Sequence, residues 1–232
     1  MSKHIRVAII DNSIDSSIYT PVTHWKHFLD AEWDSFQAKH NNFPDLRSGR
    51  YSHIILTGSE ASILVRDTWV EEEIELIHDA VERDIPVLGS CWGHQLLAVV
   101  FAGSGHVKKS INPEIGWYPL TIEKENYLLG DVTQAFVFNS HFDEVTGLDF
   151  RFDVFASTDD CAIHAFQLKG KPIWGIQSHP EMSIVHARRY LMNNVTRGHA
   201  YADLYAQALD FKPKDSGLIL RIVQNFLNSH HR

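Results

Sequence analysis

The chain of 232 residues is 44% hydrophobic and 22% charged, which is the composition of a globular protein with a sizeable core. Its formal net charge of -8 argues against nucleic acid or an anionic membrane surface as a partner. Only two cysteines are present, too few for a disulfide framework. No apolar run approaches the roughly 18 residues of a membrane-spanning helix, and residues 1–10 do not resemble a secretory leader. A cytoplasmic location is therefore expected.

The first hundred residues alternate between short apolar runs and segments with helical spacing. The apolar runs predict buried strands at residues 5–10, 54–56 and 86–88. Helices are expected at residues 22–31, after Thr68, and at residues 95–101. Such alternation is typical of a parallel sheet covered by helices. Residues 11–13, which follow the first strand, are interpreted as a turn.

The helix after Thr68 is expected to begin with a capping box, with Thr68 as the N-cap and Glu71 three residues later. Apolar residues then recur at helical spacing, namely Val70, Ile74, Ile77 and Val81. This spacing predicts one buried face. The acidic residues between them, including Glu71, Glu72 and Glu73, are expected to form a solvated face.

From about residue 106 to residue 178 the pattern changes to short strand candidates with little helix between them. They lie at residues 117–122, 135–138, 154–156, 163–168 and 173–177. This series predicts an antiparallel extension of the sheet. Further helices are expected at residues 184–193 and 218–227. Because no segment has the composition of a linker, residues 1–232 are interpreted as a single domain.

The segment Gly89-Ser90-Cys91-Trp92-Gly93-His94-Gln95 follows a predicted strand and precedes a predicted helix. This placement is typical of a nucleophile elbow, because glycines allow the sharp turn that exposes the nucleophile. The helix N-terminus favours the thiolate form of Cys91, and the backbone N–H of Trp92 can point at a developing oxyanion. For this segment alone, a buried structural cysteine between packing glycines stays an alternative.

The segment Gly175-Ile176-Gln177-Ser178-His179-Pro180-Glu181 contains the base and the orienting carboxylate that a thiolate nucleophile uses. Pro180 sets a turn after the end of a strand, so the chain can fold Glu181 back toward the imidazole of His179. Alone, the segment also fits a surface histidine before a helix start. Cys161 is interpreted as a buried structural thiol.

Together, the two segments resemble the signature of class I glutamine amidotransferase domains, a G-x-C-x-G-x-Q elbow followed by H-P-E. Here Cys91 and His179 are 88 positions apart. The loop Thr57-Gly58-Ser59 is similar to the family's oxyanion loop. The segment Asn139-Ser140-His141-Phe142-Asp143 is similar to stand-alone domains that resemble the glutaminase half of GMP synthetase. The resemblance spans most of the chain.

The resemblance implies an α/β three-layer sandwich with a flavodoxin-like core, whose largely parallel central sheet is extended by antiparallel strands. It implies that Cys91 attacks the side-chain amide of glutamine, that His179 acts as acid and base, and that Glu181 orients the imidazole. Backbone N–H groups of Gly58 and Trp92 would form the oxyanion hole. The amino-acid end of the substrate would lie near Gln95, Ser140 and His141.

No spacing in the chain is typical of metal ligands, so no metal ion is expected, and no cofactor is expected either. Because the chain contains no obvious synthetase domain, its ammonia would pass to an acceptor enzyme on a separate polypeptide. Two alternatives stay open. A γ-glutamyl peptidase or hydrolase would use the same triad on γ-glutamyl amides, and a non-catalytic regulatory subunit would retain only the fold.

Three segments depart from the family pattern, and one of them is Gly103-Ser104-Gly105, which replaces the usual adjacent glycine pair after the elbow helix. Ser90 stands where an isoleucine or valine usually precedes the nucleophile, and Thr57 stands where the oxyanion loop usually has a double glycine. These departures bear on the packing of the elbow and on the geometry of the oxyanion loop.

Overall fold

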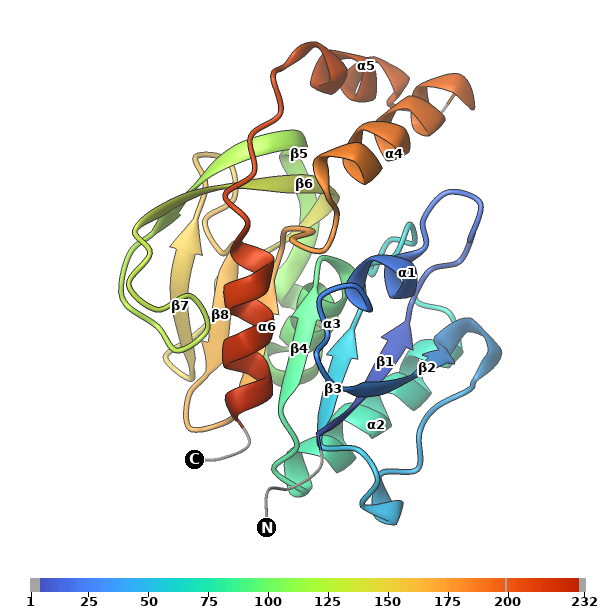
Figure 1. Ribbon diagram of the computed structural model, residues 1–232, viewed down its shortest axis with the longest axis vertical. Coiled ribbons are helices and arrows are strands. Elements are labelled where there is room, and N and C mark those ends of the chain that lie inside the picture. The colour runs from blue at the N-terminus through green and yellow to red at the C-terminus, as the bar shows by residue number, and fades with distance from the viewer. Residues whose placement is uncertain (1–4, 199, 230–232) are drawn as a thin grey trace.

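The computed structural model describes residues 5–198 and 200–229. Within them, the parallel strands are β1 (Arg6–Asp11), β2 (Glu32–Gln37), β3 (His53–Leu56), β4 (Val87–Ser90) and β9 (Ile173–Ile176). The antiparallel strands are β5 (Val107–Ile122), β6 (Gln134–Val145), β7 (Phe152–Ser157) and β8 (Ala165–Leu168). All nine form one sheet in the order β2-β1-β3-β4-β9-β8-β7-β5-β6 (Figure 1).

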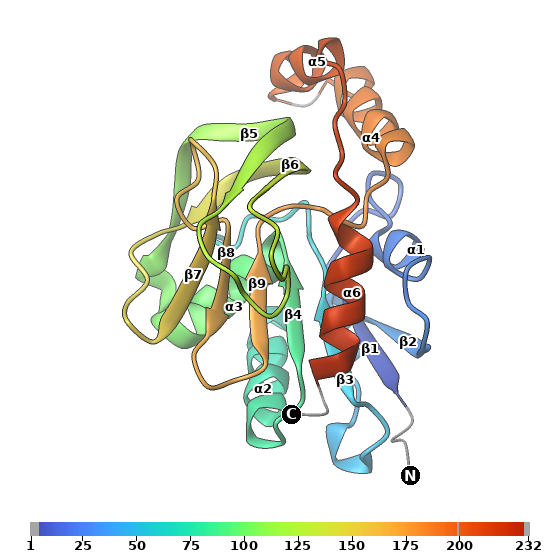
Figure 2. The ribbon, with the colours of Figure 1, turned by 60° about the vertical axis from the view of Figure 1, so that its left-hand side comes forward.

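Helices cover both faces of the parallel half of the sheet. On one face lie α2 (Trp69–Glu82) and α3 (Trp92–Ala102), and on the other lie α1 (Pro21–Trp25) and α6 (Leu218–Asn228) (Figures 1 and 2). Two further helices, α4 (Ile184–Thr196) and α5 (Ala202–Asp210), stand beyond the carboxyl ends of the parallel strands. No helix in the described ranges is both long and apolar enough to span a membrane.

The alternation of side chains along β1 explains the two packed faces. Val7 and Ile9 are fully buried in the cluster that contains the apolar face of α6. Ala8 and Ile10 are fully buried in the opposite cluster, which contains α2 and α3. Successive strand residues point to opposite faces, so a strand covered on both sides must be apolar throughout. The predicted α/β sandwich with a parallel centre and an antiparallel extension is therefore confirmed. The assignment of residues 1–232 to a single domain stays a prediction.

Two elements near the N-terminus differ from the sequence-based expectation. The helix predicted at residues 22–31 ends at Trp25, because the N–H of Phe28 bonds to the Trp25 carbonyl in a tight turn that leads into β2. The sequence analysis missed β2 itself. This edge strand is exposed or half-buried along its length, so its residues EWDSFQ lack the apolar pattern of a core strand.

Two helix predictions also need correction. Thr68 has helical backbone angles, φ -60° and ψ -31°, and its side chain caps nothing, so the predicted capping box is wrong. Instead, the N–H of Val70 bonds to the carbonyl of Asp67, which starts the first turn earlier. Helix α5 was not predicted, although its buried residues, Tyr205 and Ala208, are three positions apart as on one helix face.

One acidic residue of α2 lies in the core rather than on the expected solvated face. Glu71 and Glu72 are exposed, whereas the side chain of Glu73 is completely buried. Its Oε1 accepts a 3.1 Å hydrogen bond from Nδ2 of Asn12. Burial raises the pKa of Glu73 to about 8, and the bond from Asn12 only partly opposes this shift. Glu73 is therefore mostly neutral at pH 7, since one hydrogen bond cannot offset the burial of a charge.

The buried Glu73 should make the protein less stable as the pH rises from about 5 to about 8. Its pKa is about 8 in the folded chain against an ordinary value of 4.5, so in this window the unfolded chain releases a proton that the folded chain keeps. At about 1.4 kcal/mol per pH unit, this amounts to on the order of 4 kcal/mol. Glu73→Gln removes the titration, and chemical denaturation across this pH window should show the variant gaining stability relative to the wild type.

The exposed neighbour Glu72 supplies the control for this measurement. Glu72→Gln should change the unfolding free energy by less than about 0.5 kcal/mol at each pH. Parallel curves of unfolding free energy against pH for the wild type and Glu73→Gln would contradict the expectation.

Candidate active site

Cys91 stands at a sharp turn between β4 and α3. Its backbone has φ 50° and ψ -105°, a conformation that residues with side chains rarely adopt. A Cβ atom on Gly89 would lie 2.5 Å from the backbone of Gly93, and one on Gly93 would lie 2.5 Å from the carbonyl oxygen of Leu56. The N–H of Cys91 also donates a 2.8 Å hydrogen bond to the carbonyl of Ile176 in β9. The turn therefore requires glycine at positions 89 and 93, as expected for a nucleophile elbow.

His179 and Glu181 follow β9 and reach the same edge of the sheet. Nδ1 of His179 lies 3.0 Å from Oε1 of Glu181, and both side chains are buried. The N–H of His179 donates to the carbonyl of Phe138 at 2.9 Å, which ties this turn to β6. The second segment thus brings its base and its carboxylate together, as the sequence analysis expected from the turn at Pro180.

Tyr19 is a third partner of this pair, and the sequence analysis missed it. Its hydroxyl donates a 2.5 Å hydrogen bond to Oε1 of Glu181 and lies 3.1 Å from Nδ1 of His179. The rings of Tyr19 and His179 meet edge to face, with centroids 5.4 Å apart. Tyr19 comes from the loop between β1 and α1, where a single tyrosine has no motif that would mark it.

The electrostatics of the pair favour a charged imidazole beside Cys91. Burial alone would lower the pKa of His179, but the nearby Cys91 and Glu181 outweigh burial and raise that pKa above its ordinary value. Burial opposes ionisation of Glu181, yet His179 and the hydroxyl of Tyr19 lower its pKa. The raised pKa keeps the imidazole of His179 charged between the carboxylate of Glu181 and Cys91.

The two residues predicted to form the oxyanion hole both border Cys91. A Cβ atom on Gly58 would lie 2.7 Å from Cε1 of His179 and 3.4 Å from Cβ of Cys91, so this position accepts only glycine. Trp92 is the first residue of α3 and therefore has an N–H without an acceptor inside the helix. Its indole ring is buried against Trp69, with ring centroids 5.2 Å apart.

A pocket of about 220 Å³ opens beside Cys91. The residues predicted to contact substrate all line it, namely Gln95, Ser140 and His141. Its wall also includes side chains from α4, from α5 and from the turn between them, namely Tyr190, Asn194, Tyr201 and Tyr205. The sequence analysis did not predict this second wall, because residues 190–205 match no motif.

Two of the predicted substrate residues also bond within the protein. Nε2 of Gln95 donates to the carbonyl of Asp143 at 2.8 Å and to Oε1 of Gln177 at 3.2 Å. The hydroxyl of Ser140 donates to that of Tyr190 at 3.2 Å. Sulfur of Cys91 lies 3.9 Å from the carbonyl oxygen of Ser140. The contact of these residues with substrate stays a prediction.

His141 differs from the other two because both of its ring nitrogens face acceptors. Nδ1 lies 3.2 Å from the carbonyl oxygen of Asp143, and Nε2 lies 2.9 Å from Oε2 of Glu114. Glu114 also accepts hydrogen bonds from Nδ2 of Asn139, at 2.7 Å, and from the hydroxyl of Thr158. These contacts commit both ring nitrogens of His141 and both carboxylate oxygens of Glu114 to neighbouring groups within the protein. His141 lines the pocket, and its contact with substrate stays a prediction.

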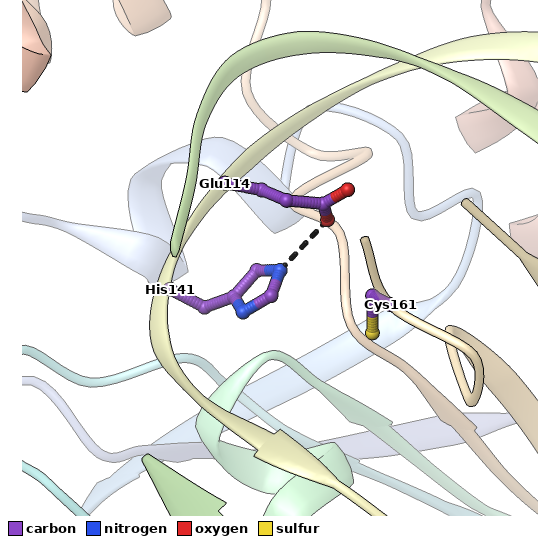
Figure 3. A group of neighbouring side chains, drawn as sticks. All are labelled: Glu114, His141 and Cys161. Carbon is purple, nitrogen blue, oxygen red and sulfur yellow. Dashed lines mark hydrogen bonds and ion pairs between the residues drawn. The ribbon is translucent and has the colours of Figure 1, made fainter. Parts of the chain in front are cut away.

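The same pair belongs to a buried cluster with Cys161, and the ligand atoms of the three residues lie within 4.8 Å of one another (Figure 3). A glutamate, a histidine and a cysteine are a possible ligand set for a transition metal. Here, however, the ring of His141 and the carboxylate of Glu114 are already committed to each other and to neighbouring groups. Burial and nearby carboxylates also raise the pKa of the Cys161 thiol, which keeps it protonated. The cluster is a buried, hydrogen-bonded pair of His141 and Glu114 with a protonated thiol beside it.

Comparisons with known proteins show which family this chain resembles. The model of the family described as Glutamine amidotransferase class-I matches residues 9–197. The chain is 32% identical over 133 residues to the glutamine-hydrolysing GMP synthase subunit of Methanocaldococcus jannaschii, a match that covers 57% of this chain and 70% of the relative. It is 31% identical over 188 residues to the corresponding protein of Methanococcoides burtonii, a match that covers 78% of this chain and 89% of the relative. For several other methanogen relatives of the same description, the matched segment spans only 54–60% of the relative's length.

A solved structure shows the same fold at low sequence identity. A glutamine amidotransferase from Thermotoga maritima superposes with a TM-score of 0.73 at 19% identity, covering 97% of each chain. The family match extends over most of the chain and includes the elbow. This chain belongs to the class I glutamine amidotransferase family.

Proposed function

We propose that this chain hydrolyses the side-chain amide of glutamine through a γ-glutamyl thioester on Cys91, and that the ammonia passes to a separate acceptor enzyme. The observation that carries the proposal is Cys91 on a strained elbow beside an imidazole that a buried carboxylate orients. Family membership supports the substrate class. The relatives described as single subunits of a glutamine-hydrolysing GMP synthase support the expectation of a synthetase partner on another polypeptide.

The residues present account for each step of this hydrolysis. The thiolate of Cys91 attacks the carboxamide carbon, and backbone N–H groups near Gly58 and Trp92 stabilise the resulting oxyanion. Loss of one such donor typically raises the barrier by about 3 kcal/mol. Because Nδ1 of His179 is bonded to Glu181, Nε2 is the nitrogen that protonates the departing ammonia. The imidazole then takes a proton from water, and the hydroxide cleaves the thioester to release glutamate and the thiolate.

Tyr19 acts in this scheme as a positioning residue. It donates to the same carboxylate oxygen of Glu181 that accepts from His179, so it fixes the acceptor toward which the imidazole is aimed. The second oxygen, Oε2, is buried and has no hydrogen-bond partner within the described ranges. Oε1 therefore carries the whole orienting interaction.

A γ-glutamyl peptidase or hydrolase is the second candidate, and the shape of the pocket favours it. The pocket beside Cys91 extends to Tyr190, Tyr201 and Tyr205, which form an aromatic wall. Such a wall provides a surface against which a substituent larger than ammonia can pack. Glutamine and γ-glutamyl amides would use the same triad.

Turnover of glutamine tests the proposed hydrolysis directly. Purified protein should release equal amounts of ammonia and glutamate from glutamine, and Cys91→Ser should lower kcat by at least about 10³-fold, because the nucleophile is lost. Cys161→Ala serves as the matched control and should retain activity. Turnover of γ-glutamyl dipeptides without turnover of glutamine would select the second candidate. Turnover of neither would support the non-catalytic regulatory role.

A glutamine analogue that carries an electrophile in place of the amide should label Cys91 and spare Cys161. Cys91 lines the pocket beside His179, whereas Cys161 is fully buried and its raised pKa keeps the thiol protonated. Mass spectrometry of peptides from the treated protein locates the label. Labelling confined to Cys161 would rule out Cys91 as the nucleophile.

Tyr19→Phe should lower kcat by about 10-fold, since it removes one hydrogen bond to a charged group in the triad. The lost bond normally lowers the pKa of Glu181, so that pKa should rise in the variant. Because Glu181 acts in its ionised form, the acid limb of kcat/KM against pH should move to higher pH. A steady-state pH profile measures both effects.

Tyr51→Phe provides the matched control for this variant. This variant also removes a tyrosine hydroxyl that donates to a carboxylate, in this case to Asp34 at 2.8 Å. Asp34 lies on the edge strand β2, away from Cys91. The pH profile of Tyr51→Phe should coincide with that of the wild type. An unchanged acid limb in Tyr19→Phe would refute the positioning role.

A further inference from the structure

We propose that Asn12 and Thr57, anchored by Glu73, fix the two peptide units that flank Gly58 and thereby position the N–H groups of the oxyanion hole. The inference rests on the proposed function, because an oxyanion forms only if Cys91 attacks an amide. It adds positioning residues that lie outside the triad and outside the substrate pocket.

The first peptide unit is held through its carbonyl. Nδ2 of Asn12 donates a 3.2 Å hydrogen bond to the carbonyl oxygen of Thr57. That carbonyl belongs to the same peptide unit as the N–H of Gly58. In a planar trans peptide the C=O and the N–H point in opposite directions, so a bond that fixes one fixes the direction of the other. Because Asn12 binds the carbonyl oxygen of Thr57, the N–H of Gly58 points away from Asn12.

The second peptide unit is held by the side chain of Thr57. Its hydroxyl donates a 3.1 Å hydrogen bond to the carbonyl oxygen of Gly58, which shares a peptide unit with the N–H of Ser59. The same hydroxyl accepts a 2.9 Å bond from the backbone N–H of Asn12. Within residues 5–198 and 200–229, neither the N–H of Gly58 nor that of Ser59 has a hydrogen-bond acceptor. Both donors are therefore oriented but unused.

Their location places these donors beside the reacting groups. A Cβ atom on Gly58 would touch His179 and Cys91, and Ser59 lines the pocket that contains Cys91. Whichever of the two N–H groups receives the oxyanion, its peptide unit is fixed by Asn12 or by Thr57. A donor that is already oriented needs no reorganisation when the charge develops, which is the basis of oxyanion stabilisation.

Glu73 anchors this arrangement from α2. Its Oε1 accepts from the same Nδ2 of Asn12 that donates to Thr57, and all three side chains are completely buried. The raised pKa of Glu73, caused by burial, keeps its carboxyl mostly neutral at pH 7. No full negative charge therefore lies behind a site that must itself stabilise one.

Thr57→Val tests the proposal with a nearly isosteric change, because valine keeps the shape and lacks the hydroxyl. With glutamine or the preferred γ-glutamyl amide, kcat should fall by about 10- to 100-fold as one donor loses its orientation, while KM changes by less than about 3-fold. Thr57→Ser keeps the hydroxyl and should retain most of the activity. Iodoacetamide alkylates a thiolate by displacement and forms no oxyanion. Its rate with Cys91 should therefore be the same in the wild type and both variants.

The outcomes separate the inference from the proposed function. A wild type that turns over neither glutamine nor γ-glutamyl amides overturns both. An active wild type with an unchanged kcat in Thr57→Val overturns the inference alone. So does a slowed alkylation in that variant, because it would mean a general distortion of the elbow. If circular dichroism shows that Thr57→Val does not fold, Asn12→Ala takes its place with the same expectations, because it removes the side-chain amide and keeps the backbone N–H that bonds to Thr57.

Discussion

The site depends on one strained residue. Cys91 has a positive φ although it carries a side chain, and such a conformation costs on the order of 1–3 kcal/mol. It persists because Gly89 and Gly93 let α3 press against the backbone of β3 and β4 at distances that no side chain would permit. The bond from the Cys91 N–H to β9 closes the turn. The same bond joins the turn to β9, which ends three residues before His179, so the strained conformation of Cys91 and its proximity to His179 have a common cause.

The buried carboxyl groups near Cys91 differ in their ionisation. Glu181 is ionised because His179 and the hydroxyl of Tyr19 lower its pKa. Glu73 has a single amide donor and is mostly neutral at pH 7. Negative charge is therefore kept on Glu181, where His179 compensates it, and is mostly absent from Glu73, which lies behind the loop at Gly58. This distribution follows from the cost of burying an unpaired charge.

The sequence predicted the candidate reacting residues of the site better than the residues that hold them in position. Cys91, His179 and Glu181 stand in local segments whose turn residues and spacing are visible in one dimension, and the buried strands show as apolar runs. The edge strand β2 has no such run, and Glu73 looked like its exposed neighbours because three acidic residues stand in a row. The rotation of α2 about its axis decides which of the three glutamates points inward. Helical spacing from Val70 and Ile77 places both position 73 and position 74 near the buried face, so the sequence does not single out Glu73.

The contacts of Tyr19 and Asn12 could not be predicted from local sequence patterns, for a different reason. Each acts through a partner distant in sequence, since Tyr19 bonds to Glu181 162 positions later and Asn12 bonds to Thr57 45 positions later. Only the parallel pairing of β1 with β3 makes the second contact possible, because it aligns the residues that follow the two strands. The carboxyl edge of a parallel sheet thus gathers loops that no motif connects. Thr57 stands where the family has a glycine. Its hydroxyl hydrogen-bonds to the N–H of Asn12 and to the carbonyl of Gly58, and a glycine could make neither bond, so in the proposed site Thr57 holds the oxyanion loop in place.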